Sequence, residues 1–494
     1  MEEMTLKLDG KELSYVNTVK YLGITLDSRL SFGPHIKDKI TKAKKYLFSL
    51  RGSIGKIWGP GPEQILWIWN AVVKPAITYG SIVWATNLTK GLRNKLNKVQ
   101  RLALTQVGHV RKSTPESGLD VILGQIPLDL HILEQAVQAR LRTKGKVDVN
   151  WNGKGTGKRT SHFAKLDELI EEYNLTDKVD NQPTTIDWNQ EYRVNLDSLG
   201  HGNDIKEGLR LYTDGSKMDM DTGYGAIFYE DEAITDTLNG KLEDHATVFQ
   251  AECTAVQEGL TLLNNAPRGA SVQVLTDNQA LVQALANKET SSESVSRTKT
   301  LLNSFGTQFD ITIHWIKAHN NYEGNEMADM LAKDGAKGLG TGPLIRTKMA
   351  TKVAKSIVTN HIIKEWDNRW KKGKDARQTR IFFPTINLSK SKKIREMNRE
   401  NIGNIIRAIT GHDFRKRHEG LVRGVEASNC RFCHNEEETS SHIIDSCPRL
   451  AEKRMEIFKT SMGSKVTPTW QPEQLAAFLS DPTISEMEVP EWEY

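Results

Sequence analysis

The hydrophobic pattern of residues 206–337 changes its period repeatedly, and this feature constrains the fold more than any other. Apolar and polar residues alternate in "LRLYTD", "GYGAIFY", "SVQVLTD" and "FDITIHWIKAH", as they do in half-buried strands. In "TVFQAECTAVQEGLTLL", "NQALVQALAN" and "EGNEMADMLAKDGA" the apolar residues recur at helical spacing instead. Strands mixed with helices predict an α/β domain in which helices cover a sheet.

Two aspartates occupy the same setting at the ends of strand patterns. Asp214 follows "LYT" and Asp277 follows "VLT", and a turn or a helix start is expected after each. If the two strands are neighbours, both carboxylates emerge side by side at one edge of the sheet. Glu252 is expected at the border of core and solvent on the helix between them, and Asp329 beside the small-residue face of the last helix. The pattern therefore predicts four converging carboxylates.

Four carboxylates at one site repel one another, and divalent cations would neutralise that repulsion. Oxygen ligands favour Mg²⁺ or Mn²⁺ over zinc. Two such ions, about 4 Å apart, can activate a water on one side of a phosphodiester and stabilise the leaving oxygen on the other. Taken singly, however, each carboxylate is more often a turn, cap or surface residue than a catalytic one. Spacing alone does not choose between these interpretations.

The ordered motifs "YTDGS", "AE", "TDN" and "HNNYEGNEMAD" make residues 206–337 resemble a type-1 ribonuclease H domain. The resemblance implies a five-stranded mixed sheet with helices and endonucleolytic cleavage of the RNA strand of RNA-DNA hybrids. It further implies a set of catalytic residues, of which the acidic ones bind two Mg²⁺ or Mn²⁺ ions and the histidine assists proton transfer or product release. These residues are Asp214, Glu252, Asp277, His319 and Asp329.

Three further residues of this region are expected to contact nucleic acid. Gly215 and Ser216 are expected to form a turn beside Asp214, from which they can reach phosphates or the 2′-hydroxyl groups that distinguish RNA from DNA. Asn278 stands where the family often has serine, and its polar side chain is expected to tune activity.

Three of the four cysteines fall in one short window, in the pattern C-x2-C-x8-H-x4-C formed by Cys430, Cys433, His442 and Cys447. Three thiolates and one imidazole would form a closed tetrahedral site for one structural zinc ion. Clustering at ligand spacing argues against unrelated thiols and against a disulfide framework. His434 is a rival ligand, although its adjacency to Cys433 makes the geometry awkward.

With the upstream run "ITGHDFRKRH", this cluster is similar to the C-terminal CCHC element of non-LTR retrotransposon polyproteins. Arg415, Lys416 and Arg417 precede it, so the module is expected to bind phosphates of RNA or DNA with an affinity that falls as salt rises. Residues 351–424 contain 19 Lys and Arg against 7 Asp and Glu. This excess suggests a polyanion partner, and a solvated helical surface is the alternative.

Residues 1–145 combine a hairpin signal at Asp9-Gly10 with long helical patterns. The runs "VKYLGITLDSRLSFGPHI" and "VVKPAITYGSIVW" resemble the thumb and connection that follow the polymerase palm in jockey-like non-LTR retrotransposon reverse transcriptases. The aromatic-x-Asp-Asp signature of polymerase active sites does not occur in this sequence. The run "YEDE", which begins at Tyr229, fails to match because its last residue is Glu232 instead of aspartate. This chain alone should therefore not polymerise DNA. Three tryptophans of this region are expected to pack in the core rather than stack on bases, namely Trp67, Trp69 and Trp84.

The predicted organisation is multidomain α+β, in the order of the C-terminal portion of a non-LTR retrotransposon polyprotein. Its parts are a thumb/connection-like region without a polymerase site (1–145), a linker (146–205), the ribonuclease H domain (206–337), a linker with a basic helical segment (338–425), a zinc module (426–450) and a tail (451–494). The acidic tail is expected to be frayed.

Two function classes are disfavoured. The longest apolar stretch, 65–77, is interrupted by Asn70 and Lys74 and is too short and polar for a membrane span. The acidic start "MEEMTLKLDG" does not resemble a signal peptide, so the nucleus or cytoplasm is expected. No small-molecule cofactor is implied.

Two alternatives to the hybrid nuclease stay open: a catalytically idle nucleic-acid-binding remnant, and a fragment of a complete RNA-directed DNA polymerase. The oligomeric state also stays open.

Overall fold

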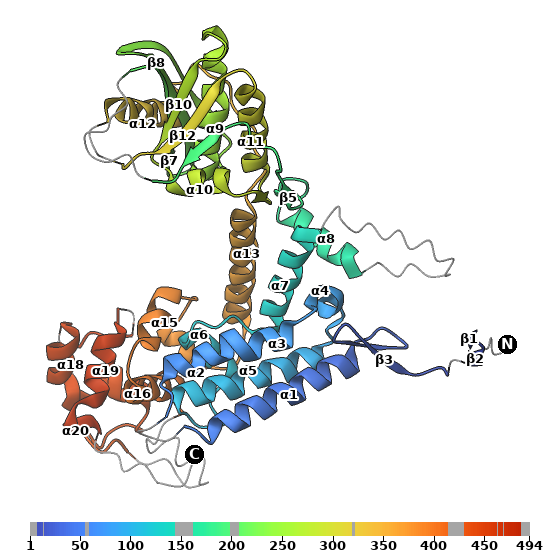
Figure 1. Cartoon of the computed structure of the whole chain (residues 1–494). Coiled ribbons are helices and arrows are strands. Elements are labelled where there is room, and N and C mark those ends of the chain that lie inside the picture. Colours follow the sequence, from blue (N-terminus) through green and yellow to red (C-terminus); the bar gives the residue numbers. More distant parts are fainter. Residues whose placement is uncertain are drawn as a thin grey trace. The chain divides into compact units, whose positions relative to one another are not determined.

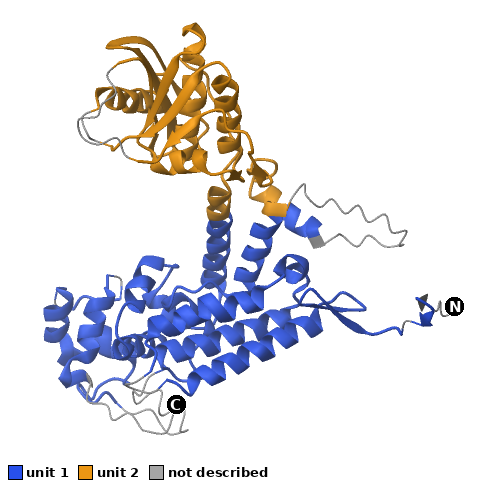
Figure 2. Cartoon of the chain, viewed as in Figure 1, with its two compact units in different colours: residues 1–140, 156–169, 358–494 blue, residues 141–155, 170–357 orange. Residues whose placement is uncertain are grey.

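The computed structural model of the chain forms two compact units (Figures 1 and 2). One unit contains residues 1–140, 156–169 and 358–494, and the other contains residues 141–155 and 170–357. The structure describes residues 7–12, 14–54, 59–143, 162–197, 207–318, 322–412, 429–461, 463–467 and 469–485.

The second unit is built on a six-stranded mixed sheet with the order β6-β12-β10-β7-β8-β9. Its strands are β6 (Arg193–Asn195), β7 (Leu209–Met218), β8 (Asp221–Glu230), β9 (Ala233–Leu242), β10 (Ser271–Thr276) and β12 (Asp310–Trp315). β7, β8 and β9 form an antiparallel meander, whereas β6, β12, β10 and β7 are parallel neighbours. The expected mixed sheet is confirmed, and the short edge strand β6 is an addition to its five strands.

Helices cover both faces of this sheet, and Figure 1 shows α12 on one side with α9 and α11 on the other. These helices are α9 (Val248–Gly259), continued by the 3-10 helix η3 (Leu260–Asn265), α10 (Gln279–Ala286), α11 (Glu293–Gly306) and α12 (Glu323–Ala336). Because side chains alternate along a strand, Leu211 packs with Cys253 and Leu302 on one face, whereas Tyr212 packs with Ala328 on the other. The helical and strand patterns of the sequence are confirmed.

Part of the segment predicted as a linker is folded into the second unit. β5 (Thr185–Ile186) pairs antiparallel with β11 (Glu289–Thr290), and β6 pairs with β12. Tyr192, which is 5% exposed, joins the main core, and its hydroxyl donates to the carbonyl of Leu285 over 3.0 Å. The chain after α12 returns to the same region, since the backbone N–H of Asp180 donates to the carbonyl of Met349. Both flanks of residues 206–337 therefore contribute to this unit.

The N-terminal part of the first unit begins with two hairpins. β1 (Lys7–Leu8) pairs with β2 (Lys11–Glu12), and β3 (Thr18–Tyr21) pairs with β4 (Ile24–Asp27). The connecting Asp9 and Gly10 have φ of 50° and 77°, as a tight two-residue turn requires, so the predicted hairpin is confirmed. Helices follow: α1 (Gly33–Arg51), α2 (Pro62–Ile68), the π-helix η1 (Trp69–Val73), α3 (Lys74–Thr78), α4 (Ser81–Trp84), the 3-10 helix η2 (Ala85–Asn87), α5 (Lys90–Gly108), α6 (Glu116–Ile122) and α7 (Leu128–Thr143).

The three tryptophans predicted to pack, Trp67, Trp69 and Trp84, differ in their surroundings. Trp69 and Trp84 are buried, which confirms that they pack in the core. The same expectation is wrong for Trp67, which is 65% exposed. The reason is helical geometry, because the buried Ile65 and Trp69 define the inner face of the helix and Trp67 lies on the outer face.

The C-terminal part of the first unit is also helical. Its elements are α14 (Arg377–Phe382), α15 (Leu388–Arg395), α16 (Arg399–Thr410), the π-helix η4 (His442–Ser446), the 3-10 helix η5 (Pro448–Leu450), α18 (Ala451–Phe458), α19 (Pro472–Ser480) and α20 (Pro482–Ser485). Three helices contribute residues to both units, namely α7, α8 (His162–Glu172) and α13 (Thr351–Lys372). In the described ranges, no helix combines the length and the apolarity needed to cross a membrane.

The expectation of a frayed tail is wrong for the described residues of the tail, 451–461, 463–467 and 469–485. Trp470 is buried and its ring lies edge-on to Phe382 and Phe383, with centroid distances of 5.9 and 5.5 Å. The indole N–H of Trp470 also donates to the carbonyl of Phe382 over 3.0 Å. Packing of these aromatic side chains, together with buried Phe478, holds the segment against the helices before it.

Candidate active site and cysteine cluster

Three of the predicted carboxylates meet where β7 and β10 run side by side. Asp214, Glu252 and Asp277 each offer an oxygen that lies within 4.8 Å of the others. The parallel register places Thr213 of β7 opposite Thr276 of β10, so the aspartates that follow them are neighbours. This confirms that Asp214 and Asp277 lie side by side at one position of the sheet.

The expected turn at Gly215 and Ser216 is wrong. β7 continues to Met218, with Gly215 opposite Tyr224 of β8, and the hairpin turns only after Met218. Gly215 is instead buried where α9 rests on the strand, and a Cβ atom there would lie 2.5 Å from the backbone nitrogen of Glu252. The glycine therefore lets α9 approach β7 closely enough to hold Glu252 beside Asp214. Contact of Gly215 or Ser216 with nucleic acid stays a prediction.

Glu252 is more deeply buried than its expected position at the border of core and solvent. Only 3% of its surface is exposed, because α9 lies directly on β7. The start of α9 is fixed by a capping box between Thr247 and Gln250. Glu252 receives a hydrogen bond from Asn278, while its Oε2 is buried and has no partner among the described residues. A buried carboxylate oxygen without a partner is costly, and a bound cation would satisfy it.

Asn278 has a structural role in addition to the nucleic-acid contact predicted for it, which stays a prediction. Its side-chain oxygen accepts a hydrogen bond from the backbone N–H of Leu281 over 3.0 Å and so caps α10. The same side chain hydrogen-bonds to Glu252. Asn278 thereby links the start of α10 to a carboxylate of the cluster.

Asp277 is oriented by two residues that sequence reasoning missed. Asn325, only 6% exposed on α12, donates from Nδ2 to Oδ2 of Asp277 over 3.1 Å. Trp315, at the end of β12, donates from its indole nitrogen to the carbonyl of Asp277 over the same distance. A signal for Asn325 was present, because it stands four positions before Asp329 and so shares its helix face.

Asp329 lies beside the cluster and outside the group of three carboxylates that can share one metal position. The close approach of α12 to β8 is confirmed, since a Cβ atom on Gly225 would lie 2.5 Å from the carbonyl oxygen of Ala328. The carboxyl group of Asp329 forms a hydrogen bond with that of Asp214. It also forms an ion pair with Lys333, with 2.6 Å between Nζ and Oδ2. His319 lies outside the described residues.

Burial raises the pKa of both Asp214 and Glu252, and the charges of neighbouring carboxylates raise it further. A hydrogen bond from the backbone of Gly215 acts in the opposite direction on both pKa values. Both pKa shifts reflect a crowding of buried negative charge that a divalent cation would neutralise. An all-oxygen donor set, mutual repulsion and the unpartnered Oε2 of Glu252 together fit a hard divalent ion such as Mg²⁺ or Mn²⁺.

Residues 206–337 match the family model for ribonuclease H. They form a ribonuclease H domain. The chain is 29% identical over 124 residues to an R1 retrotransposon Pol polyprotein of Nasonia vitripennis, a match that covers 25% of this chain and 36% of that protein. It is 28% identical over 130 residues to the ribonuclease H of Cupriavidus necator, covering 24% of this chain and 86% of that enzyme.

Among solved structures, ribonuclease H1 of Halobacterium salinarum is 21% identical in sequence to the matched part of this chain. The match covers 26% of this chain and 97% of the chain in that structure, with a TM-score of 0.23. By sequence, the ribonuclease H domain is related to the R1-type Pol polyproteins, and the matches span 36% and 14% of the length of the two such proteins from Nasonia vitripennis and Bradysia coprophila.

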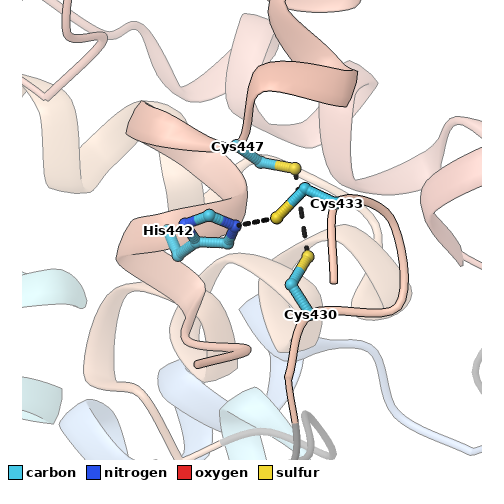
Figure 3. Close-up of side chains that lie close together, drawn as sticks. All are labelled: Cys430, Cys433, His442 and Cys447. Carbon is cyan, nitrogen blue, oxygen red and sulfur yellow. Dashed lines mark hydrogen bonds between the residues drawn. The ribbon is translucent and has the colours of Figure 1, made fainter. Parts of the chain in front are cut away.

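Outside the ribonuclease H domain, the four predicted zinc ligands converge in the first unit (Figure 3). Ligand atoms of Cys430, Cys433, His442 and Cys447 all lie within 4.8 Å of one another. The sulfurs of Cys430 and Cys447 are 3.9 Å apart, and that of Cys433 lies 3.3 Å from Nε2 of His442. Each of these cysteines is a free thiol. His434, the rival ligand, is exposed and does not belong to the group.

Two acidic residues that sequence reasoning missed support this cluster. Glu436 accepts a hydrogen bond from Nδ1 of His442 over 2.8 Å, which leaves Nε2 directed at the thiols. Glu438, only 1% exposed, forms an ion pair of 2.6 Å with Arg431, the residue that follows Cys430. Three sulfurs and one nitrogen match the donor set of a structural zinc site, so this group could hold zinc. Arg415, Lys416 and Arg417 lie outside the described residues.

Proposed function

We propose that the protein is an endonuclease that hydrolyses the RNA strand of RNA-DNA hybrids and leaves 3′-hydroxyl and 5′-phosphate ends. The observation that carries this proposal is the convergence of Asp214, Glu252 and Asp277 in a domain of the ribonuclease H family. Relatedness to R1-type Pol polyproteins supports a retrotransposon origin, in which the activity would clear template RNA after reverse transcription.

Asp214, Glu252, Asp277 and Asp329 would hold two Mg²⁺ ions, or two Mn²⁺ ions. When bound, these ions would activate the attacking water and stabilise charge on the phosphodiester and the leaving oxygen. Asn325 holds the carboxylate of Asp277, and Asn278 holds that of Glu252, so the donor oxygens are oriented before any ion arrives. His319 is proposed, from the sequence pattern alone, to take up or release a proton at its imidazole ring.

A hybrid substrate is proposed because the family cleaves RNA paired with DNA, and selection for RNA needs a contact to the 2′-hydroxyl. Ser216, half-buried on β7 two residues after Asp214, is a candidate for that contact. Asn278 is a second candidate, although its side chain already caps α10.

Cleavage of a labelled RNA-DNA hybrid in Mg²⁺ tests the proposal, with duplex RNA, duplex DNA and single-stranded RNA as comparison substrates. We expect selective cleavage of the hybrid, and losses of more than about 100-fold in Asp214→Asn and Glu252→Gln, beyond the range for residues that only orient a ligand. Asp334→Asn is the control, because Asp334 lies on α12 but pairs with Lys337. Equal cleavage by Asp214→Asn would sink the proposal, and hybrid binding without cleavage would favour the idle nucleic-acid-binding remnant.

We also infer that the cysteine cluster holds one structural zinc ion and belongs to a nucleic-acid-binding module. The convergence of three thiols and His442, with Glu436 behind the imidazole, supports this second function. Metal analysis of the purified chain should find about one zinc per molecule, the stoichiometry of a four-ligand site. Cys447→Ser should lower the zinc content and weaken binding to single-stranded RNA and DNA. Full nucleic-acid affinity in a zinc-free variant would contradict this role.

Residues 1–145 are proposed to correspond to the thumb and connection of a reverse transcriptase, on the resemblance of their sequence alone. In that case the chain would be part of a longer RNA-directed DNA polymerase. Template-directed DNA synthesis by this chain on a primed RNA is the assay, and no synthesis is expected without an aromatic-x-Asp-Asp sequence.

A further inference from the structure

Helix α12 carries two acid-lysine ion pairs, and only one of them lies at the carboxylate site. Lys333 pairs with Asp329 over 2.6 Å, and Lys337 pairs with Asp334 over 3.3 Å. The two lysines have nearly the same exposure, 49% and 50% of their side-chain surface. They differ in what their aspartate partner touches, because Asp329 alone is hydrogen-bonded to Asp214.

The ammonium group of Lys333 is therefore within the electrostatic field of two of the proposed metal ligands. The hydrogen bond with Asp329 is the main reason why the pKa of Lys333 is raised, and the charge of Asp214 contributes in the same direction. Lys333 thus supplies positive charge beside the carboxylates, as a bound cation would.

We propose that Lys333 is an internal counter-ion of this site, which pairs with Asp329 in the metal-free protein and competes with a divalent ion for that carboxylate. This inference rests on the proposed function, since it assumes that the carboxylates bind divalent ions. An ammonium group and a divalent ion on the same carboxylate repel each other, so binding at Asp329 requires Lys333 to move away. Its exposed side chain has solvent to move into.

A consequence of this competition is an order of metal binding. Asp214, Glu252 and Asp277 can share one ion among three carboxylates, and Asp329 is not part of that group. The first ion is therefore expected to bind to those three carboxylates. A second ion, which needs Asp329, must displace Lys333 and binds more weakly. Lys333 would then set the divalent-ion concentration at which the site becomes fully loaded.

The test measures Mn²⁺ binding to the zinc-loaded full chain by isothermal titration calorimetry, without substrate. In Lys333→Gln the weaker Mn²⁺ dissociation constant should fall about two- to fivefold, the range expected for loss of an exposed ion pair. Lys333→Arg keeps the charge and should stay near the wild-type value. Lys337→Gln is the matched control and should leave Mn²⁺ affinity unchanged, because Asp334 is not a proposed ligand.

A double-mutant cycle adds a second readout. In the Asp329→Asn background, Lys333→Gln should no longer change Mn²⁺ affinity, because the lysine has lost the carboxylate for which it competes. Unchanged or weaker Mn²⁺ binding in Lys333→Gln would overturn the inference and leave the nuclease proposal standing. Absence of Mn²⁺ binding to the wild-type chain would overturn the nuclease proposal itself and this inference with it.

Discussion

Single residues that hydrogen-bond to the proposed ligands are expected to determine the metal affinity of both candidate sites. Asn325 and Glu436 each hold one ligand side chain in a fixed orientation, through hydrogen bonds of 3.1 Å to Asp277 and 2.8 Å to His442. Such outer partners raise metal affinity because they remove the alternative orientations of the ligand. Neither residue was predicted. The signal for Asn325 was its place on the helix face of Asp329, four positions earlier, whereas Glu436 stands in an acidic run and has no distinctive sequence signal.

Asn325→Ala should therefore lower hybrid cleavage about 10- to 100-fold and shift the Mg²⁺ dependence to higher concentration. The physical reason is that Oδ2 of Asp277 loses its donor and the carboxylate is free to rotate. Cleavage rates measured across a Mg²⁺ titration test this. Asn303→Ala serves as a control, because it removes a similar hydrogen bond of 3.0 Å to Asp187 outside the carboxylate cluster. An unchanged Mg²⁺ dependence in Asn325→Ala would count against this role.

Glu436→Gln should weaken zinc binding about 10-fold or more, because a neutral amide is a poorer partner for Nδ1 of His442. Competition with a chromogenic chelator measures this affinity directly and needs no nucleic acid. Glu456→Gln, which removes only an exposed contact of 3.6 Å to Lys453, is expected to bind zinc like the wild type. Equal zinc affinities for the two variants would show that Glu436 does not support the ligand.

At the scale of elements, the contact between α9 and β7 decides where Glu252 lies. The apolar stripe of the sequence predicted α9, but it did not reveal that the helix rests directly on Gly215. This contact brings the backbone of the helix onto the strand and buries Glu252 beside Asp214. The strand itself was expected to end at Asp214, and it continues because pairing with β8 extends to Met218.

Gly215→Ala should consequently impair both stability and activity. Its methyl group would lie 2.5 Å from the nitrogen of Glu252 and 2.9 Å from Cβ of Ala251, so α9 must shift outward. Overpacking of this kind lowers the free energy of unfolding by about 1–3 kcal/mol. Hybrid cleavage should also fall, because the shift of α9 moves Glu252 away from Asp214. Denaturant unfolding and hybrid cleavage measure the two effects. Gly91→Ala, where a Cβ atom meets nothing within 4 Å, should show neither.

At the scale of the whole molecule, the raised pKa values of Asp214 and Glu252 link stability to pH. When a carboxyl pKa is higher in the folded than in the unfolded state, the folded state binds more protons above the ordinary carboxyl pKa. The free energy of unfolding therefore falls as pH rises through the window between the unfolded and folded pKa values.

We accordingly expect the melting temperature of the EDTA-treated protein to fall between about pH 5 and about pH 8, measured by scanning calorimetry. Saturating Mg²⁺ should reduce this fall, because the bound ions take over the charge that protons balance. Asp214→Asn should also flatten the profile in EDTA, since one of the repelling carboxyl groups is gone. A profile that is flat in EDTA, or that Mg²⁺ leaves unchanged, would contradict the linkage.

The second unit also extends beyond the ribonuclease H match. Tyr192 is a core residue although it lies before residue 206, and β6 completes an edge of the sheet. The surrounding Gly-, Asn- and Thr-rich sequence indicated a linker, because local composition does not report a long-range strand partner. The same limitation explains the tail, whose buried Trp470 packs against residues almost ninety positions earlier.

The sequence by itself determined the types of most elements, the ribonuclease H motifs, the neighbouring positions of Asp214 and Asp277, and the cysteine-histidine spacing. These features depend on short-range periodicity and on ligand chemistry, both of which are written locally in the chain. Only the tertiary structure decided that Glu252 is buried, that Tyr192 joins the core and that Asn325 donates to Asp277. Each of these depends on which surfaces meet in space, and no local pattern encodes that.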